Sequence, residues 1–155
     1  MAYRIKGLEV AQFASFIGAS EEELAQQGAI RVVATPRSPC RITLEAAPVG
    51  ESLILLNHVS HDVATPFRAS HAIYVRENAV AAAQFVDRQP PLFDQCTLSL
   101  RAFDADAMLI EGVLAAPGEA DGRVRSLFAK PETAYIHAHY AAYGCFAAVV
   151  ERTDD

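Results

Sequence analysis

The clearest hydrophobic pattern lies in the C-terminal half, where apolar and polar positions alternate with a period of two. Residues 97–103 and 107–114 alternate on either side of a short acidic turn, which predicts an antiparallel hairpin. Residues 133–140 and 145–151 alternate in the same way and predict a second hairpin. Because these last strands are rich in aromatic and β-branched residues, we expect them near the middle of the sheet.

The N-terminal half is less regular and predicts short strands, short helices and loops. Strands are expected at 3–8, 30–34, 41–45, 53–56 and 71–76. Helices are expected at 13–17, 20–27, 79–86 and 117–129. The helix at 20–27 opens with a capping box, Ser20 and Glu23, whereas the polar residues 57–69 predict a loop. Since regular βαβ alternation is absent, we expect an α+β fold: a mainly antiparallel sheet with a few short helices packed on it, in one domain spanning 1–155.

The composition is that of an ordinary folded protein. The chain has 155 residues, of which 52% are hydrophobic and 21% charged, so it can bury a core without disulfides or a structural metal. Its net charge of −6 argues against nucleic-acid binding, which requires clustered lysine and arginine. No apolar run approaches the ~20 residues of a membrane-spanning helix.

The cellular location is inferred from two further features. The first residues lack the apolar core of a signal peptide. The three cysteines, Cys40, Cys96 and Cys145, match no zinc or redox spacing. We therefore expect a cytoplasmic protein with reduced thiols.

The segment 135–146 concentrates the reactive side chains of the chain. If it is extended, His137 and His139 share one face of the strand with Tyr135, and the apolar residues between them share the other. The two imidazoles then lie roughly 6.5 Å apart along the strand. That spacing lets them bind one metal ion or one anion together.

A metal site would need a third or fourth ligand, because zinc usually takes three or four protein ligands. His58 and His61, in the predicted loop, are candidates if they fold over the strand, and His71 and Cys145 are two others. The glutamate that follows a His-x-His pair in cupin-type sites is missing here, since the next acid is Glu151. The alternative is a half-exposed strand whose polar face carries histidine.

Cys145 is a candidate nucleophile, because a neighbouring base or cation can depress the pKa of a thiol. His137 or His139 would supply that base across the predicted hairpin. The alternative is that Cys145 is a small core residue, since free cysteine is among the most buried residue types.

Three arginines complete the set of candidate ligand-binding residues. Arg41 and Arg101 are expected on strands, on the face opposite the apolar side chains, and Arg68 in the loop. If they converge beside His137 and His139, they form a pocket for a carboxylate or a phosphate. The alternative is that each is a solvated surface arginine.

Several segments, taken in order along the chain, carry a resemblance to a known family. They are Tyr3–Leu8, Pro39–Glu45 with Pro48–Glu51, Pro66–Ser70, Ser99–Ala105, and Tyr135–His139 with Gly144–Phe146. Together they resemble an uncharacterised bacterial family of proteins of about this length, domain of unknown function 1203. The resemblance implies a bacterial, single-domain, intracellular protein. It implies no reaction, cofactor or catalytic residue.

Three functions are compatible with these residues. We favour a protein that binds a small anionic ligand on a polar face near His137 and His139. The second hypothesis is a hydrolase-like enzyme that uses these histidines with a metal or with Cys145. The third is a non-enzymatic protein whose polar face docks a partner. The sequence indicates no particular cofactor and fixes neither the ligand nor the oligomeric state.

Overall fold

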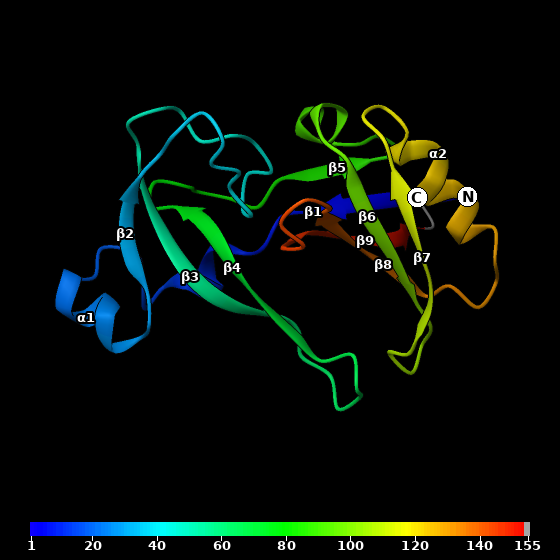
Figure 1. The fold of residues 1–155 in the computed structure, drawn as a ribbon, viewed down its shortest axis with the longest axis horizontal. Coiled ribbons are helices and arrows are strands. Elements are labelled where there is room, and N and C mark those ends of the chain that lie inside the picture. The colour runs from blue at the N-terminus through cyan, green and yellow to red at the C-terminus, as the bar shows by residue number, and fades with distance from the viewer. Residues whose placement is uncertain (154–155) are drawn as a thin grey trace.

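The computed structural model describes residues 1–153, and over this range the chain forms nine strands in two antiparallel sheets. The larger sheet has the order β5-β1-β9-β8-β6-β7 and contains β1 (Ala2–Lys6), β5 (Gln84–Val86), β6 (Leu98–Phe103), β7 (Leu109–Ala115), β8 (Tyr135–Tyr140) and β9 (Phe146–Thr153). The smaller sheet has the order β2-β3-β4 and contains β2 (Ile30–Val33), β3 (Ser52–His61) and β4 (Ala69–Arg76). Figure 1 shows the two sheets side by side.

The helices of the described chain are few and short. They are α1 (Glu21–Gln26), α2 (Ala120–Phe128) and the 3₁₀ turns η1 (Val10–Phe13) and η2 (Pro91–Gln95). The predicted capping box is confirmed: the Ser20 hydroxyl accepts from the Glu23 amide at 3.1 Å, and the Glu23 carboxylate accepts from the Ser20 amide at 2.8 Å. None of the helices within residues 1–153 has the length and apolar character needed to cross a membrane. The fold is thus mostly antiparallel sheet with few short helices, although it has two sheets where one was expected.

The larger sheet has one apolar and one polar face, because successive side chains of a strand point to opposite sides. On the apolar face, β6 and β8 pack against α2 through Leu98, Leu100, Ala102, Ile136, Ala138, Val124, Leu127 and Phe128. The residues between these strand positions lie on the other face. They include Arg101, Phe103, Tyr135, His137 and His139.

The smaller sheet has its own core, and its longest hairpin extends beyond that core. Ile54, Leu56, Ile73 and Val75 pack with Phe13 and Leu24. Beyond them, β3 and β4 continue toward the turn between β6 and β7, which Figure 1 shows at the lower edge of the molecule. There the Thr65 hydroxyl donates to the Ala107 carbonyl at 3.2 Å. The β3–β4 hairpin therefore lies over the polar face of the larger sheet.

The strand predicted at 41–45 does not form, although its apolar residues alternate. Residues 41–44 form a turn, in which Leu44 has a φ of 54°. Ile42 is buried in the core of the smaller sheet and Leu44 in the core of the larger sheet. The alternation therefore reflects a connection that packs against two cores, and not a strand on one of them.

Two further predictions are wrong at the level of local structure. Residues 57–69 are not one loop, because β3 continues to His61 and β4 begins at Ala69, with polar side chains on both strands. The helix predicted at 79–86 is replaced by β5, whose Phe85 pairs with Ile5 of β1. In both segments backbone pairing with a neighbouring strand overrides the local pattern.

The hairpin formed by β8 and β9 is confirmed at the middle of the larger sheet, between β6 and β1. Amides in both strands are hydrogen-bonded in ladders and should exchange slowly with deuterium, whereas the exposed turn residues Ala142 and Tyr143 should exchange fast. Hydrogen exchange followed by NMR measures this directly. Uniformly fast exchange across 135–153 would contradict the central position of the hairpin.

Candidate functional site

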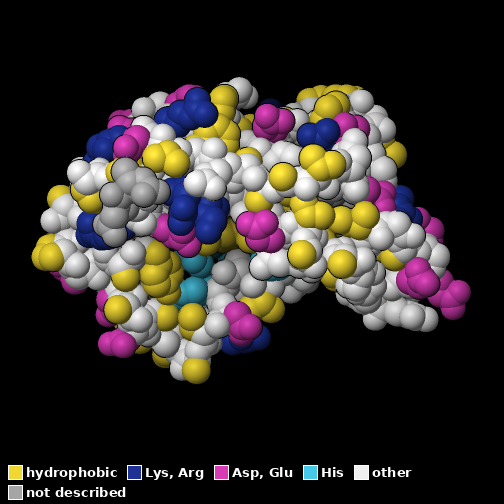
Figure 2. Space-filling view, turned by 180° about the vertical axis from the view of Figure 1, so that it is seen from behind, with side chains coloured by type: hydrophobic (Ala, Val, Ile, Leu, Met, Phe, Trp, Pro, Cys, Tyr) yellow, Lys and Arg dark blue, Asp and Glu magenta, His cyan; other side chains and the backbone are white. Residues whose placement is uncertain are grey.

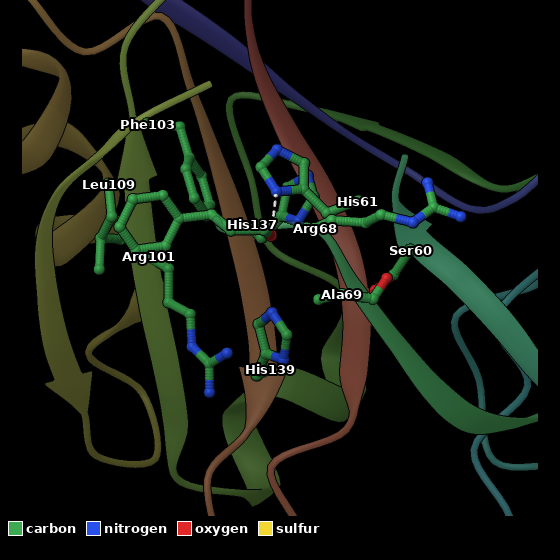
Figure 3. A pocket seen from close by; sticks show the side chains of 10 residues that line it. Ser60, His61, Arg68, Ala69, Arg101, Phe103, Leu109, His137 and His139 are labelled. Atoms are coloured by element: carbon green, nitrogen blue, oxygen red, sulfur yellow. Dashed lines mark hydrogen bonds between the residues drawn. The ribbon is translucent and has the colours of Figure 1, made fainter. Parts of the chain in front are cut away.

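A cavity of about 270 Å³ lies between the polar face of the larger sheet and the β3–β4 hairpin. Arg101, Phe103, His137 and His139 form its floor, and Leu109 borders it from β7. The hairpin contributes Ser60, His61, Phe67, Arg68 and Ala69. Figure 2 shows histidine side chains at the bottom of this hollow, and Figure 3 shows the lining residues from close by.

His137 is buried among aromatic rings at the centre of the floor. It is 4% exposed, and its ring centroid lies 4.7 Å from that of His61 and 5.3 Å from those of Phe103 and Phe146. Within residues 1–153 no hydrogen bond joins either of its ring nitrogens to another group. Burial is the main cause that lowers the pKa of His137 to about 3, and the neighbouring His61, His139 and Arg101 add to the shift. The ring is therefore neutral at physiological pH.

His139 is oriented by the backbone of the turn that follows β8. Its Nδ1 lies 2.9 Å from the Gly144 carbonyl, and since a carbonyl can only accept, Nδ1 carries the proton. Burial lowers the pKa of His139 to about 4 against the opposing effect of this hydrogen bond, with Arg101, His71 and Arg41 as further causes. The Nε2 atom is thus left as a lone-pair acceptor that the turn does not occupy.

His61 fixes the hairpin over the sheet. Its Nδ1 donates to the Phe67 carbonyl at 2.8 Å, so its Nε2 accepts from the Tyr135 hydroxyl at 2.7 Å. Burial raises the pKa of Tyr135, with Asp104 adding to the shift, which keeps the proton on the phenol oxygen. This bridge connects β8, the end of β3 and the loop before β4, and it sets the width of the cavity.

Arg101 carries a positive charge that no acidic side chain within residues 1–153 balances. Its one hydrogen bond to another part of residues 1–153 is to the Ser99 hydroxyl, at 3.4 Å, and no carboxylate of that range forms an ion pair with it. Figure 3 shows its guanidinium beside the His139 ring. Gly112 of β7 lies opposite Arg101 and has no side chain to cover it. The guanidinium therefore remains open to the cavity.

Arg41 does not lie on a polar strand face as expected. It is 2% exposed and does not line the cavity; its guanidinium donates to the Phe146 carbonyl at 2.7 Å and the Pro39 carbonyl at 2.6 Å. Because residues 41–44 turn between the two cores, the side chain is buried with the backbone. Its charge still acts on the site, since Arg41 is among the causes that lower the pKa of His71 and His139.

Cys145 is half-buried and pairs with this arginine and not with a histidine. The Arg41 guanidinium donates to its sulfur at 3.2 Å, and the thiol packs against the core of the larger sheet. It does not line the cavity. The structure thus provides no histidine base next to Cys145.

The other candidate ligands are spread over several places. Arg68 lies at the mouth of the cavity, exposed and ion-paired with Asp62. His58 is oriented toward Phe13, with ring centroids 5.7 Å apart, and does not line the cavity. The ring centroid of His71 lies 5.0 Å from that of His139. Across residues 1–153 no three His, Cys, Asp or Glu side chains are placed to hold a metal ion.

Sequence reasoning missed the aromatic part of the site. Phe103 follows Arg101 by two residues on the same strand face, so the period of two could have identified it. Ser60 and Phe67 carry no such signal, because the β3–β4 pairing shifts between Val59 and His61. That irregularity decides which hairpin side chains face the sheet.

The histidine pKa values predict how stability depends on pH. In the unfolded chain His137 and His139 bind protons near pH 6.5, whereas in the folded chain they stay neutral down to about pH 3 and 4. Below pH 6.5 the unfolded state therefore binds more protons, and the free energy of unfolding should fall by about 1.4 kcal/mol per pH unit for each such imidazole. Urea unfolding at pH 7.5, 6.5, 5.5 and 4.8 measures this slope.

A matched variant separates the contribution of one imidazole. His137→Phe keeps an aromatic ring among the same neighbours. It removes one titrating imidazole, so the slope of the unfolding free energy against pH should fall by about 1.4 kcal/mol per pH unit. Carboxylates with a lowered pKa, such as Glu77 and Asp121, lose their contribution only below about pH 4.5, outside this window. Equal stability of the parent protein at pH 7.5 and 5.5 would contradict buried, neutral histidines.

Comparison with known proteins gives one match. Residues 37–152 match the model of a family described as Protein of unknown function (DUF1203). The matched range includes both strands of the floor, the β3–β4 hairpin and Arg41. No curated protein and no solved structure matches the chain. Since the family model covers most of the 155 residues, the chain belongs to the DUF1203 family of proteins of unknown function.

Proposed function

We propose that this protein binds a small anion in the cavity between its two sheets, with Arg101 as the main partner. The observation that carries the proposal is the charge of Arg101, which has no ion-pair partner among residues 1–153 and is half-buried and open to the cavity. A partly buried charge without a counter-charge is costly for the folded state. A carboxylate or phosphate would supply that counter-charge through charge-assisted hydrogen bonds, which a planar guanidinium forms in pairs.

The surroundings of Arg101 favour an anion over a cation. The cavity is lined by two arginines and three histidines and by no Asp or Glu within the described residues. Arg41 does not line the cavity, but its buried positive charge acts on His139. Although the chain has a net charge of −6, the charged side chains that line the cavity within residues 1–153 are arginines, which attract negative charge.

The protonation state of His139 gives this site a second property. While neutral, its Nε2 presents a lone pair and repels an anion oxygen, but a protonated Nε2 donates a hydrogen bond. A nearby negative charge raises the pKa of an imidazole, so the anion should bring a proton with it. The site would then combine Arg101 and a protonated His139 around one ligand.

Replacing Arg101 tests the proposal. In Arg101→Gln we expect the affinity for acetate and for inorganic phosphate to fall about tenfold or more, since a hydrogen bond to a charged group is worth ~1.5–3 kcal/mol. Isothermal titration calorimetry measures both affinities. The matched control is Arg68→Gln, because Arg68 also lines the cavity but is exposed and already paired with Asp62.

We expect Arg68→Gln to bind within about threefold of the parent, because exposed ion pairs contribute little. Melting temperatures of both variants show whether the fold is retained. If Arg101→Gln binds both anions as the parent does, or if the parent binds neither, the proposal is wrong.

Proton uptake is the separate test of His139. Calorimetry of acetate binding at pH 7.0, in two buffers with different heats of ionisation, reports the protons exchanged with the buffer. We expect net uptake, and therefore affinity that rises as the pH falls from 7.5 to 6.0. His139→Asn should remove the uptake. Binding without proton uptake would contradict the role of His139 and leave that of Arg101 in place.

A further inference from the structure

We infer that the anion this cavity binds is the carboxylate of a small aromatic acid. The inference rests on the proposed function and names the ligand class. Arg101 and His139 would hold the carboxylate, and the aromatic side chains at the other end of the cavity would hold the ring.

The aromatic end of the cavity consists of several rings that pack against one another. Phe103 is 4% exposed and stacks on Tyr135, with centroids 5.4 Å apart and planes at 17°. Phe67 meets Phe103 edge to face at 6.3 Å, and Leu109 pairs with Phe103 from β7. The Tyr135 stack and the His61 bridge hold these rings in place before any ligand arrives.

The charged and aromatic side chains line the same small cavity. Arg101 and Phe103 occupy positions i and i+2 on the same face of β6, so their backbones are about 6.6 Å apart. Figure 3 shows the Arg101 guanidinium on the side of His139 and away from the Phe103 ring, so these two groups lie further apart than their backbones. A carboxylate joined to a single ring, directly or through a short linker, fits between them within the cavity of about 270 Å³.

The size and polarity of the cavity exclude larger polar ligands. Its volume of about 270 Å³ is below the ~300–1,000 Å³ of sites for drug-sized molecules. Apart from the arginines and histidines, the described lining residues offer one polar side chain, the hydroxyl of Ser60. A sugar phosphate or nucleotide needs several such groups for its hydroxyls, whereas a ring needs none. Aromatic rings also prefer the edge-to-face contacts that Phe67, Phe103 and His137 offer.

The experiment measures four probes on the intact protein by calorimetry: acetate, benzoate, cyclohexanecarboxylate and inorganic phosphate. We expect benzoate to bind at least tenfold tighter than acetate, and tighter than cyclohexanecarboxylate and phosphate. In Phe67→Ala the affinity for benzoate should fall at least fivefold, while that for acetate stays within twofold. Phe67 is half-buried on a loop, so its removal spares both cores.

The matched control is Tyr143→Ala, an aromatic residue that is 83% exposed in the β8–β9 turn, and it should bind all four probes as the parent does. Equal affinity for benzoate and acetate, both lost in Arg101→Gln, would overturn the aromatic ligand and leave anion binding intact. Equal affinity for benzoate and cyclohexanecarboxylate, or tighter binding of phosphate, would also overturn it. If no probe binds, the proposed function itself fails.

Discussion

The pairing of β6 with β8 determines which side chains face the cavity and which face the core. Arg101 pairs with His137 and Ser99 with His139, so these side chains must share one face of the sheet. The neighbours between them, such as Leu100 and Ala138, are held on the other face by the core against α2. A shift of one residue would bury the arginine in that core, so packing on one face fixes the chemistry on the other.

The site also depends on the β3–β4 hairpin, which covers the polar face of the larger sheet. A sheet with one core face normally exposes the other to water, where histidines keep an ordinary pKa. Here the β3–β4 hairpin and the His61–Tyr135 hydrogen bond exclude much of that water. Desolvation then keeps His137 and His139 neutral. Because a guanidinium is always charged in proteins, Arg101 and Arg41 leave the surroundings of the two histidines positive.

The sequence predicted what alternation alone determines and missed what depends on contacts between distant segments. Both C-terminal hairpins and the shared face of His137 and His139 follow from a period of two, and they are confirmed. The position of the β3–β4 hairpin over the larger sheet was not predicted. The polar residues at the ends of β3 and β4 have the composition of a loop, and their strand pairing is seen only in the folded chain. Arg41 was misplaced for a related reason: the segment around it alternates between two cores, a pattern that a single strand also produces.

The central claim is that the charge of Arg101 is left open for an anion. The most direct measurement is anomalous diffraction from a crystal soaked in sodium bromide, because bromide is an anion that needs no shape recognition. We expect an anomalous peak inside the cavity, within hydrogen-bond distance of the Arg101 guanidinium and on the side of His139. Bromide peaks confined to the outer surface, with the cavity occupied by water alone, would contradict it.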